Sequence, residues 1–128
     1  MNFAYTLLYV PDVARSVEFY ERAFGLTRRF LSEEGNYAEM ETGGTALGFV
    51  AADFAQGNLP DGFQTNDRSR LPAGIEIAFT TPDVPAGFAR AVSAGALPVT
   101  RPSQKPWGQH VAYVRDLDGV LVEIASPM

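Results

Sequence analysis

The sequence contains no cysteine. Disulfide bonds, thiolate nucleophiles and zinc sites built on sulfur are therefore excluded. No apolar run approaches the ~20 residues that a helix needs to cross a bilayer. The first residues, Met1 to Val10, also lack the basic segment of a signal peptide. From these absences we expect a cytoplasmic protein that has no membrane segment.

Basic residues are few. Ten Lys and Arg stand against fifteen Asp and Glu, which gives a net charge of −5, and the basic residues are scattered along the chain. A nucleic-acid partner requires a clustered positive surface, so we expect none. An acidic balance favours a cationic ligand, although a net charge of this size also serves solubility.

Length and composition are those of an ordinary globular chain. The 128 residues are 46% hydrophobic and 20% charged, which excludes disordered and fibrous classes. A chain of this length can bury a sizeable core without disulfides or metals. We therefore expect a single domain over residues 1–128.

The chain carries an internal repeat. Val10-Pro11-Asp12-Val13 recurs in the second half as Thr81-Pro82-Asp83-Val84. Each copy follows a short apolar segment and opens a stretch whose apolar residues recur at helical spacing. Asp12 and Asp83 stand where N-cap residues accept hydrogen bonds from the first helical turn. The repeat predicts one strand followed by one helix in each half.

Both helical stretches end near a glycine, Gly25 in the first half and Gly95 in the second, as C-terminal caps prefer. A further strand and a hairpin follow each of them, with glycine at each hairpin turn. The predicted hairpin strands are Asn36–Met40 and Thr45–Val50 in the first half and His110–Arg115 and Val120–Ala125 in the second.

Each half therefore predicts the element order βαβββ, and the fold class is α+β. Module one takes about residues 1–55 and module two about residues 74–128. The segment at about 52–73 lacks periodicity and is interpreted as a long structureless linker that crosses from one module to the other.

These motifs, in this order, resemble the vicinal-oxygen-chelate superfamily of glyoxalases, bleomycin-resistance proteins and dioxygenases. Ser16–Tyr20 with Gly25-Leu26 looks like its first-module signature, and Asp116–Ile124 looks like its closing Asp-Pro-Asp-Gly-x-x-x-Glu hairpin. Pro106-Trp107-Gly108 is similar to a common subgroup. The resemblance covers nearly the whole chain and implies two βαβββ modules that form an incomplete barrel with a concave ligand pocket.

Two carboxylates interrupt apolar strands. Glu123 lies within Val-Leu-Val-Glu-Ile-Ala, and alternation places it opposite the core positions Val122 and Ile124. A carboxylate there must be paired, hydrogen-bonded or protonated, or face a wet cavity. Glu76 alternates in the same way with Ile77. We interpret both as pocket residues, and the alternative for Glu123 is a salt bridge to an arginine at the strand edge.

The metal-dependent members of the family hold histidines at the starts of the first strands of both modules. By this resemblance Tyr5 and Glu76 occupy those two places, and the ligand position in the last strand of module one falls near Gly48. Of the usual ligand set only Glu123 remains. We therefore expect no metal and no other cofactor, although two carboxylates and a phenol could hold a hard divalent cation weakly.

Aromatic residues complete the predicted pocket. Tyr9 shares the face of Tyr5 by alternation, and by the resemblance Trp107 and Tyr113 line the pocket wall. His110 is the single histidine and could act as an acid or base near neutral pH. Its place at a strand start, out of register with Tyr113, favours instead a position on the other face of the sheet or in solvent.

Three functions follow. The first is a metal-free binding protein for an aromatic or cationic compound, as in the drug-resistance branch of the family, because aromatic walls and carboxylates suit such ligands. The second is a lyase, isomerase or dioxygenase in which Glu123 is the candidate catalytic residue. The third is an interaction module with a vestigial pocket. The resemblance and the exposed sheet edges also imply a homodimer. The candidate ligand-binding residues are Tyr5, Tyr9, Glu76, Trp107, Tyr113 and Glu123.

Overall fold

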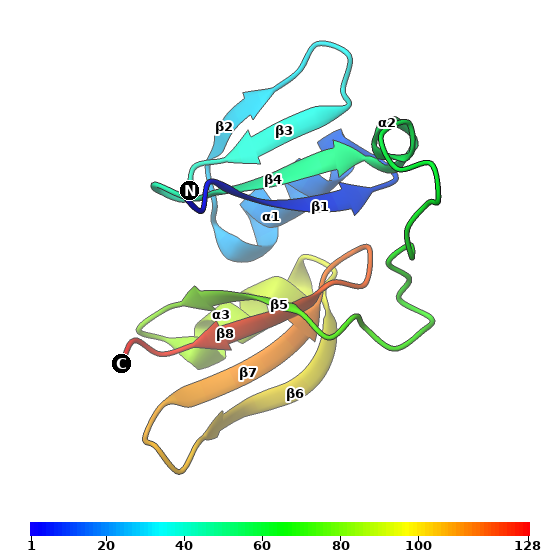
Figure 1. Ribbon diagram of the computed structural model, residues 1–128. Helices are drawn as coiled ribbons and strands as arrows, with labels where there is room; N and C mark the ends of the chain where they lie inside the picture. Colours follow the sequence, from blue (N-terminus) through cyan, green and yellow to red (C-terminus); the bar gives the residue numbers. More distant parts are fainter. The chain divides into compact units, whose positions relative to one another are not determined.

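The computed structural model describes all residues, 1–128, and contains the βαβββ order twice (Figure 1). The chain divides into two compact units. The first unit comprises residues 1–21 and 25–65, and the second comprises residues 22–24 and 66–128. No helix is long and apolar enough to span a membrane.

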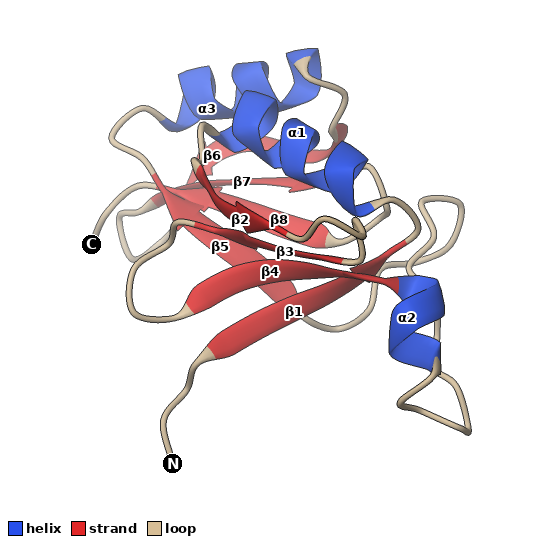
Figure 2. Ribbon diagram, turned by 90° about the horizontal axis from the view of Figure 1, so that it is seen from above, coloured by secondary structure: helices blue, strands red, loops and turns tan.

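The first unit is a mixed four-stranded sheet covered by a helix on one face (Figure 2). Its strands run in the order β1-β4-β3-β2, with β1 parallel to β4 and the other pairs antiparallel. The rings of Tyr20 from α1 and Phe49 from β4 are both buried, with centroids 5.0 Å apart, so α1 covers the face to which Phe49 belongs. The elements are β1 (Tyr5–Val10), α1 (Val13–Phe24), β2 (Arg28–Leu31), β3 (Tyr37–Met40), β4 (Ala46–Ala51) and α2 (Ala52–Gln56).

The second unit repeats this design with the strand order β5-β8-β7-β6. Helix α3 covers the face to which Ile124 belongs, since a Cβ atom at Gly87 of α3 would lie 3.3 Å from the Ile124 side chain. Val122 and Ile124 are buried, which confirms their predicted core positions. In each unit we call the face away from the helix the open face. The elements are β5 (Glu76–Thr80), α3 (Val84–Ser93), β6 (Leu97–Gln104), β7 (His110–Arg115) and β8 (Leu121–Ala125).

The helix boundaries follow from their capping residues. The Asp12 carboxylate accepts a hydrogen bond from the Arg15 amide at 3.1 Å, and Asp83 accepts one from the Ala86 amide at 3.0 Å. Gly25 ends α1 in the left-handed conformation at φ 70°, which a residue with a side chain rarely adopts. The caps predicted at Asp12 and Asp83 are confirmed.

The predicted fold class is confirmed as well. Both modules have the order βαβββ, both hairpins lie within one residue of their predicted bounds, and each sheet stays open with two edge strands. Of the predicted elements, β7 has the expected bounds, His110–Arg115.

The prediction of a structureless linker at about 52–73 is wrong at the start of the segment. Ala52–Gln56 form α2, which buries Ala55, and this five-residue helix is too short to produce a periodic pattern in the sequence. Further along, the backbone at 67–70 is held by the guanidinium of Arg115. The contact between Arg115 and this segment joins residues far apart in the chain, so it cannot be predicted from the local sequence.

Candidate functional site

Strand register brings the predicted carboxylates and one tyrosine together on the open face of the second unit. Glu123 on β8 pairs with Ala78 of β5 on one side and with Tyr113 of β7 on the other. Glu76 is the first residue of β5 and lies two positions along from Ala78, so its side chain emerges on the same face. We call Glu76, Tyr113 and Glu123 the Glu-Tyr-Glu cluster.

A short hydrogen bond connects two members of this cluster. The Tyr113 hydroxyl donates to Glu123 Oε2 at 2.7 Å. This bond is the main reason that the pKa of Tyr113 rises to about 12, with burial and the charges of Glu123 and Glu76 adding to it. Ionising the phenol would break the bond and place a negative charge beside a carboxylate. Tyr113 therefore remains a neutral donor at physiological pH.

The third member, Glu76, lies next to Glu123. Its pKa is raised above the ordinary value of 4.5, first by burial and then by the hydrogen bond and the charge of the Glu123 carboxyl. Neither carboxylate forms an ion pair, since the ion pairs of the structure join other residues. The alternative of a salt bridge from Glu123 to an arginine is therefore wrong. The partner of Glu123 is Tyr113, which the family resemblance placed in the same pocket but did not pair with it.

The cluster is accessible from solvent. Tyr113 and Glu123 are half-buried and Glu76 is exposed. Tyr113 donates to Glu123 alone and neither glutamate forms an ion pair, so part of the negative charge of the two carboxylates is uncompensated. This arrangement can hold a cation, and Glu76 can accept or release a proton above the usual pH for a glutamate.

In the first unit, the position that corresponds to Glu123 is Gly48. Gly48 pairs with Leu7 of β1 and Glu39 of β3, as Glu123 pairs with Ala78 and Tyr113. A Cβ atom at Gly48 would lie 2.8 Å from Leu7 Cδ2 and 2.9 Å from the Ala38 carbonyl oxygen. No side chain fits there without displacing backbone, so this position supplies no ligand.

Sequence reasoning missed Glu39, which lies beside Gly48 on the open face. The Tyr37 hydroxyl donates to Glu39 Oε1 at 3.0 Å, and the pKa of Tyr37 rises to about 12 because of burial and this bond. A tyrosine-carboxylate pair therefore occurs in each unit. The sequence did contain a signal for Glu39, because it alternates along the strand with the apolar residues Ala38 and Met40, which are buried.

Tyr5 and Tyr9 belong to the open face of the first unit. Tyr5 is 54% exposed and close enough to Tyr37 for its charge to raise the pKa of Tyr37. The Tyr9 ring is half-buried and packs edge-on against Phe63 from the linker, with centroids 4.8 Å apart. Tyr5 is thus available to a ligand, whereas Tyr9 is partly covered.

Trp107 and His110 do not join the Glu-Tyr-Glu cluster. Trp107 is 64% exposed in the β6–β7 loop, and its indole N–H donates to Gln109 Oε1 at 2.9 Å. It lines a shallow hollow with Gly108, Gln109, Pro127 and Met128, to which no member of the cluster contributes. His110 is exposed, in accordance with the position in solvent that its sequence context allows.

The residues present do not fit the metal site of the metal-dependent members. No group of three or more His, Cys, Asp or Glu side chains converges in a way that could hold a metal ion. Glu76 and Glu123 supply two carboxylates, and the neighbouring phenol is a donor to one of them. Catalytic metal centres generally need three protein ligands.

The duplicated βαβββ order, with two open four-stranded sheets, is the architecture of glyoxalase-like folds. The model of the Glyoxalase/Bleomycin resistance protein/Dioxygenase superfamily matches residues 2–124, so the chain belongs to this superfamily. No curated protein matches the chain.

Solved structures with the same fold include a glyoxalase-related enzyme from Fulvimarina pelagi, with a TM-score of 0.84 and 23% identity over 99% of this chain and 88% of that one. A glyoxalase/bleomycin resistance protein/dioxygenase family enzyme from Burkholderia phytofirmans PsJN has a TM-score of 0.84 and 19% identity, with both chains fully covered. TioX from Micromonospora sp. ML1 has a TM-score of 0.73 and 24% identity, again with full coverage of both chains. At these identities the likeness shows the fold alone.

Proposed function

We propose that this protein binds an aromatic or cationic small molecule, without a metal, through the Glu-Tyr-Glu cluster on the open face of its second unit. The observation that carries the proposal is the uncompensated negative charge of Glu76 and Glu123 beside the neutral phenol of Tyr113. Carboxylates attract the charge of a cation and an aromatic face attracts it through its quadrupole.

Titration with benzyltrimethylammonium, an aromatic cation, tests this proposal. Calorimetry at constant ionic strength should give saturable binding, and the neutral benzyl alcohol should bind at least about tenfold more weakly because it lacks the charge. Equal affinity for the two compounds would contradict the role of the carboxylates. No binding of either compound would favour an interaction module with a vestigial pocket.

The raised pKa of Glu76 favours an acid-base enzyme as a second candidate. In a lyase or isomerase of this kind Glu123 would remove a proton next to a carbonyl group, and Glu76 would return one. NMR of phenylacetone in deuterated buffer would reveal this chemistry as exchange of its C–H protons for deuterium. Exchange at the buffer rate in the presence of the protein would count against it.

Protein purified without chelators is expected to carry no stoichiometric transition metal, because two adjacent carboxylates and a glycine at the Gly48 position do not complete a ligand set. Elemental analysis checks this expectation. About one Zn, Fe, Mn or Ni per chain would show that other residues complete the site.

We also expect a homodimer in solution. Each sheet ends in two edge strands, β1 and β2 in the first and β5 and β6 in the second, whose backbone groups are available for pairing. Sedimentation at micromolar concentration should give twice the chain mass of 13.9 kDa. The mass of one chain across the concentration range would refute this expectation.

A further inference from the structure

The open face of the first unit carries a second surface with a carboxylate at its centre. Glu39 of β3 pairs with Gly48 of β4 on one side and with Phe30 of β2 on the other. Gly48 in turn pairs with Leu7 of β1, so Leu7, Glu39 and Phe30 emerge in one row across the sheet. Tyr37 lies two positions from Glu39 along β3 and shares its face. We call Leu7, Phe30, Tyr37 and Glu39 the Glu39 surface.

Three of these four side chains are apolar or aromatic, and they remain accessible. Phe30 is 49% exposed, Leu7 is 39% exposed and Tyr37 is half-buried. The rings of Phe30 and Tyr37 lie beside one another, with centroids 6.4 Å apart and planes at 50°. Two such rings can contact one cation together, since a ring attracts a cation within about 6 Å of its centroid. The surface therefore suits a ligand that is both apolar and positively charged.

Glu39 supplies the opposite charge. Its Oε1 atom accepts a hydrogen bond from the Tyr37 hydroxyl at 3.0 Å, and it forms no ion pair. Tyr37 stays neutral, because burial and this bond raise its pKa to about 12. The Glu39 carboxylate is thus half-buried beside apolar side chains with its negative charge uncompensated.

Arg29 is close to Glu39 but is bound elsewhere. The pKa of its guanidinium is raised, first by its hydrogen bonds to Glu41 and then by the charges of Glu41 and Glu39. Its Nε and Nη2 atoms donate to the two Glu41 oxygens at 2.9 and 2.6 Å, and Nη2 also donates to the Gly43 carbonyl oxygen at 3.1 Å. Arg29 and Glu41 neutralise one another, so the charge of Glu39 is left for a ligand.

Gly48 keeps the middle of the surface free of a further side chain. It has no positive φ angle, so its backbone conformation does not require glycine. A Cβ atom there would lie 2.8 Å from Leu7 Cδ2 and 3.8 Å from Glu39 Cγ. Glycine therefore lets Leu7 lie across β4 toward Glu39, which places an apolar side chain next to the carboxylate.

We propose that the Glu39 surface binds a small methylated ammonium compound of the size of choline. The Glu39 carboxylate balances its charge, and the rings of Phe30 and Tyr37 contact its methyl groups, over which the charge of a quaternary ammonium is spread. A quaternary ammonium has no N–H groups that need acceptors, so apolar neighbours such as Leu7 suit it. All these residues belong to the first unit, so the proposal does not rest on the function of the Glu-Tyr-Glu cluster.

NMR titration of the ¹⁵N-labelled full chain with choline chloride at constant ionic strength tests the proposal. Saturable shifts are expected at the amides of residues 30, 37–39 and 48. The neutral compound 3,3-dimethyl-1-butanol has the same shape, with carbon in place of the charged nitrogen, and should bind there about tenfold more weakly. Equal affinity for the two compounds, or no saturable shift at these amides, would overturn the proposal.

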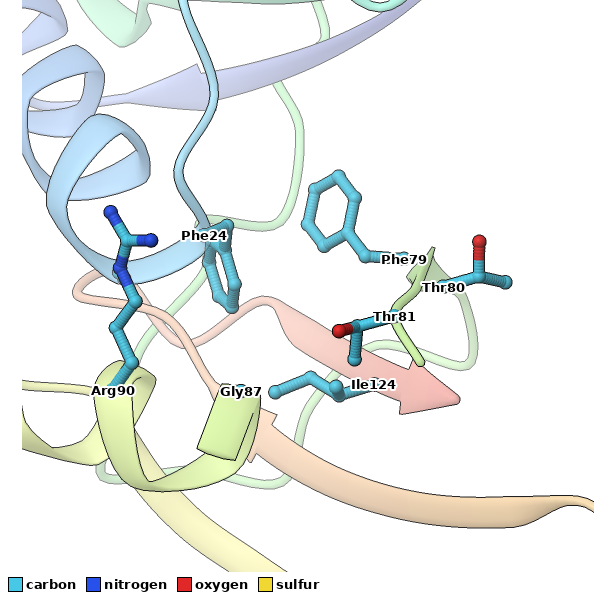
Figure 3. A pocket seen from close by; sticks show the side chains of 8 residues that line it. Phe24, Phe79, Thr80, Thr81, Gly87, Arg90 and Ile124 are labelled. Atoms are coloured by element: carbon cyan, nitrogen blue, oxygen red, sulfur yellow. The ribbon is translucent and has the colours of Figure 1, made fainter. Parts of the chain in front are cut away.

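The positions of the shifts separate this surface from other places in the chain. Figure 3 shows an apolar cavity of about 130 Å³ on the helix-covered side of the second sheet, where Thr81, Gly87 and Ile124 lie. Shifts confined to residues 81, 87 and 124 would assign choline to that cavity. Shifts confined to residues 76–78 and 121–123 would assign it to the Glu-Tyr-Glu cluster. Either result would refute binding at the Glu39 surface.

Variants with equal changes of charge complete the test. Glu39→Gln should weaken the choline response at residues 37–39 about tenfold, because the amide keeps the Tyr37 hydrogen bond but loses the charge. Glu18→Gln, at an exposed position of α1, and Glu123→Gln in the second unit should leave this response unchanged, whether or not the cluster binds cations. Equal choline affinity of Glu39→Gln and the wild type would refute the site.

Phe30→Leu examines the ring separately from the charge. Leucine keeps an apolar side chain at this exposed position but removes the π-electrons. Choline binding should weaken about threefold, while binding of 3,3-dimethyl-1-butanol should stay unchanged. An equal loss for both compounds would contradict recognition of the cation by the ring. If Glu39→Gln does not fold, the comparison of the two compounds in the wild type still decides the question.

Discussion

Replacing Arg115 with leucine is expected to lower the free energy of unfolding by about 3 kcal/mol, because buried hydrogen bonds to a charged group are lost and their acceptors stay behind. Arg115 is only 7% exposed. Its guanidinium donates to the carbonyl oxygens of Asp67, Arg68 and Arg70 in the linker, at 2.9, 3.1 and 2.7 Å. A fourth bond, from Nε to the Gly119 carbonyl at 3.0 Å, ties the same group to the β7–β8 turn.

Urea denaturation of Arg115→Leu, Arg115→Lys and Arg101→Leu measures this contribution. Lysine keeps the charge but cannot span several carbonyl groups with one planar fork, so it should rescue only part of the loss. Arg101 is an exposed residue of β6, and its replacement should change the free energy of unfolding by less than about 0.5 kcal/mol. A similarly small effect at Arg115 would mean that the linker is held by other contacts.

The same residue connects the linker to the open face. Leu121 of β8 pairs with Glu76 on one side and with Arg115 on the other. Arg115 therefore emerges in the row of Glu76, and its guanidinium binds the backbone of the segment 67–70. Gly119 makes room for this contact, since a Cβ atom there would lie 2.8 Å from Arg115 Nη2 and 2.9 Å from the Arg68 amide nitrogen. Loss of Arg115 should accordingly speed proteolysis between residues 65 and 73.

The fold was predictable because its signals are local and occur twice. A capping aspartate, an apolar stripe and a glycine turn each specify an element within a few residues, and the duplication sets their order. Asp12 and Asp83 illustrate this, since each bonds to an amide three positions away. The linker was not predictable in the same way, because its conformation depends on Arg115, which is 45 or more positions from the carbonyl groups that it binds.

The sequence was enough to predict which sheet face carries the candidate site residues. It was not enough to predict the hydrogen bonds that these residues form. Alternation along a strand is enough to put Glu76 and Glu123 on the face opposite the core positions, whereas Tyr113 was placed with them by the family resemblance. The hydrogen bond between Tyr113 and Glu123 depends on the register of two strands and on rotamers, which alternation does not specify. Trp107 was placed in the pocket by resemblance, which does not specify the hydrogen bond that its indole N–H donates to Gln109.

Cation binding should strengthen as the pH rises, and the pKa of Glu76 determines the pH range in which it does so. Its pKa is raised above 4.5 in the folded protein, so its carboxylate forms at a higher pH than that of an ordinary glutamate. A raised pKa also means that the folded state holds this proton more tightly than the unfolded state does. The contribution of Glu76 to stability is therefore fully present below pH 4.5 and is lost as the pH rises through the raised pKa. Glu76→Gln should flatten the pH dependence of cation binding and that of stability. Calorimetric titrations and thermal melts between pH 4 and 8 measure the two.

Replacing Glu123 with glutamine should weaken the binding of benzyltrimethylammonium about tenfold or more, because one of two adjacent negative charges is removed. The amide oxygen still accepts the Tyr113 hydrogen bond, so the fold is retained. The melting temperature should stay equal or rise, since the charge that opposes Glu76 is lost. Glu18→Gln, at an exposed position of α1, changes the net charge equally and should alter neither quantity. A large drop in melting temperature with unchanged affinity would assign Glu123 to the fold and not to the ligand.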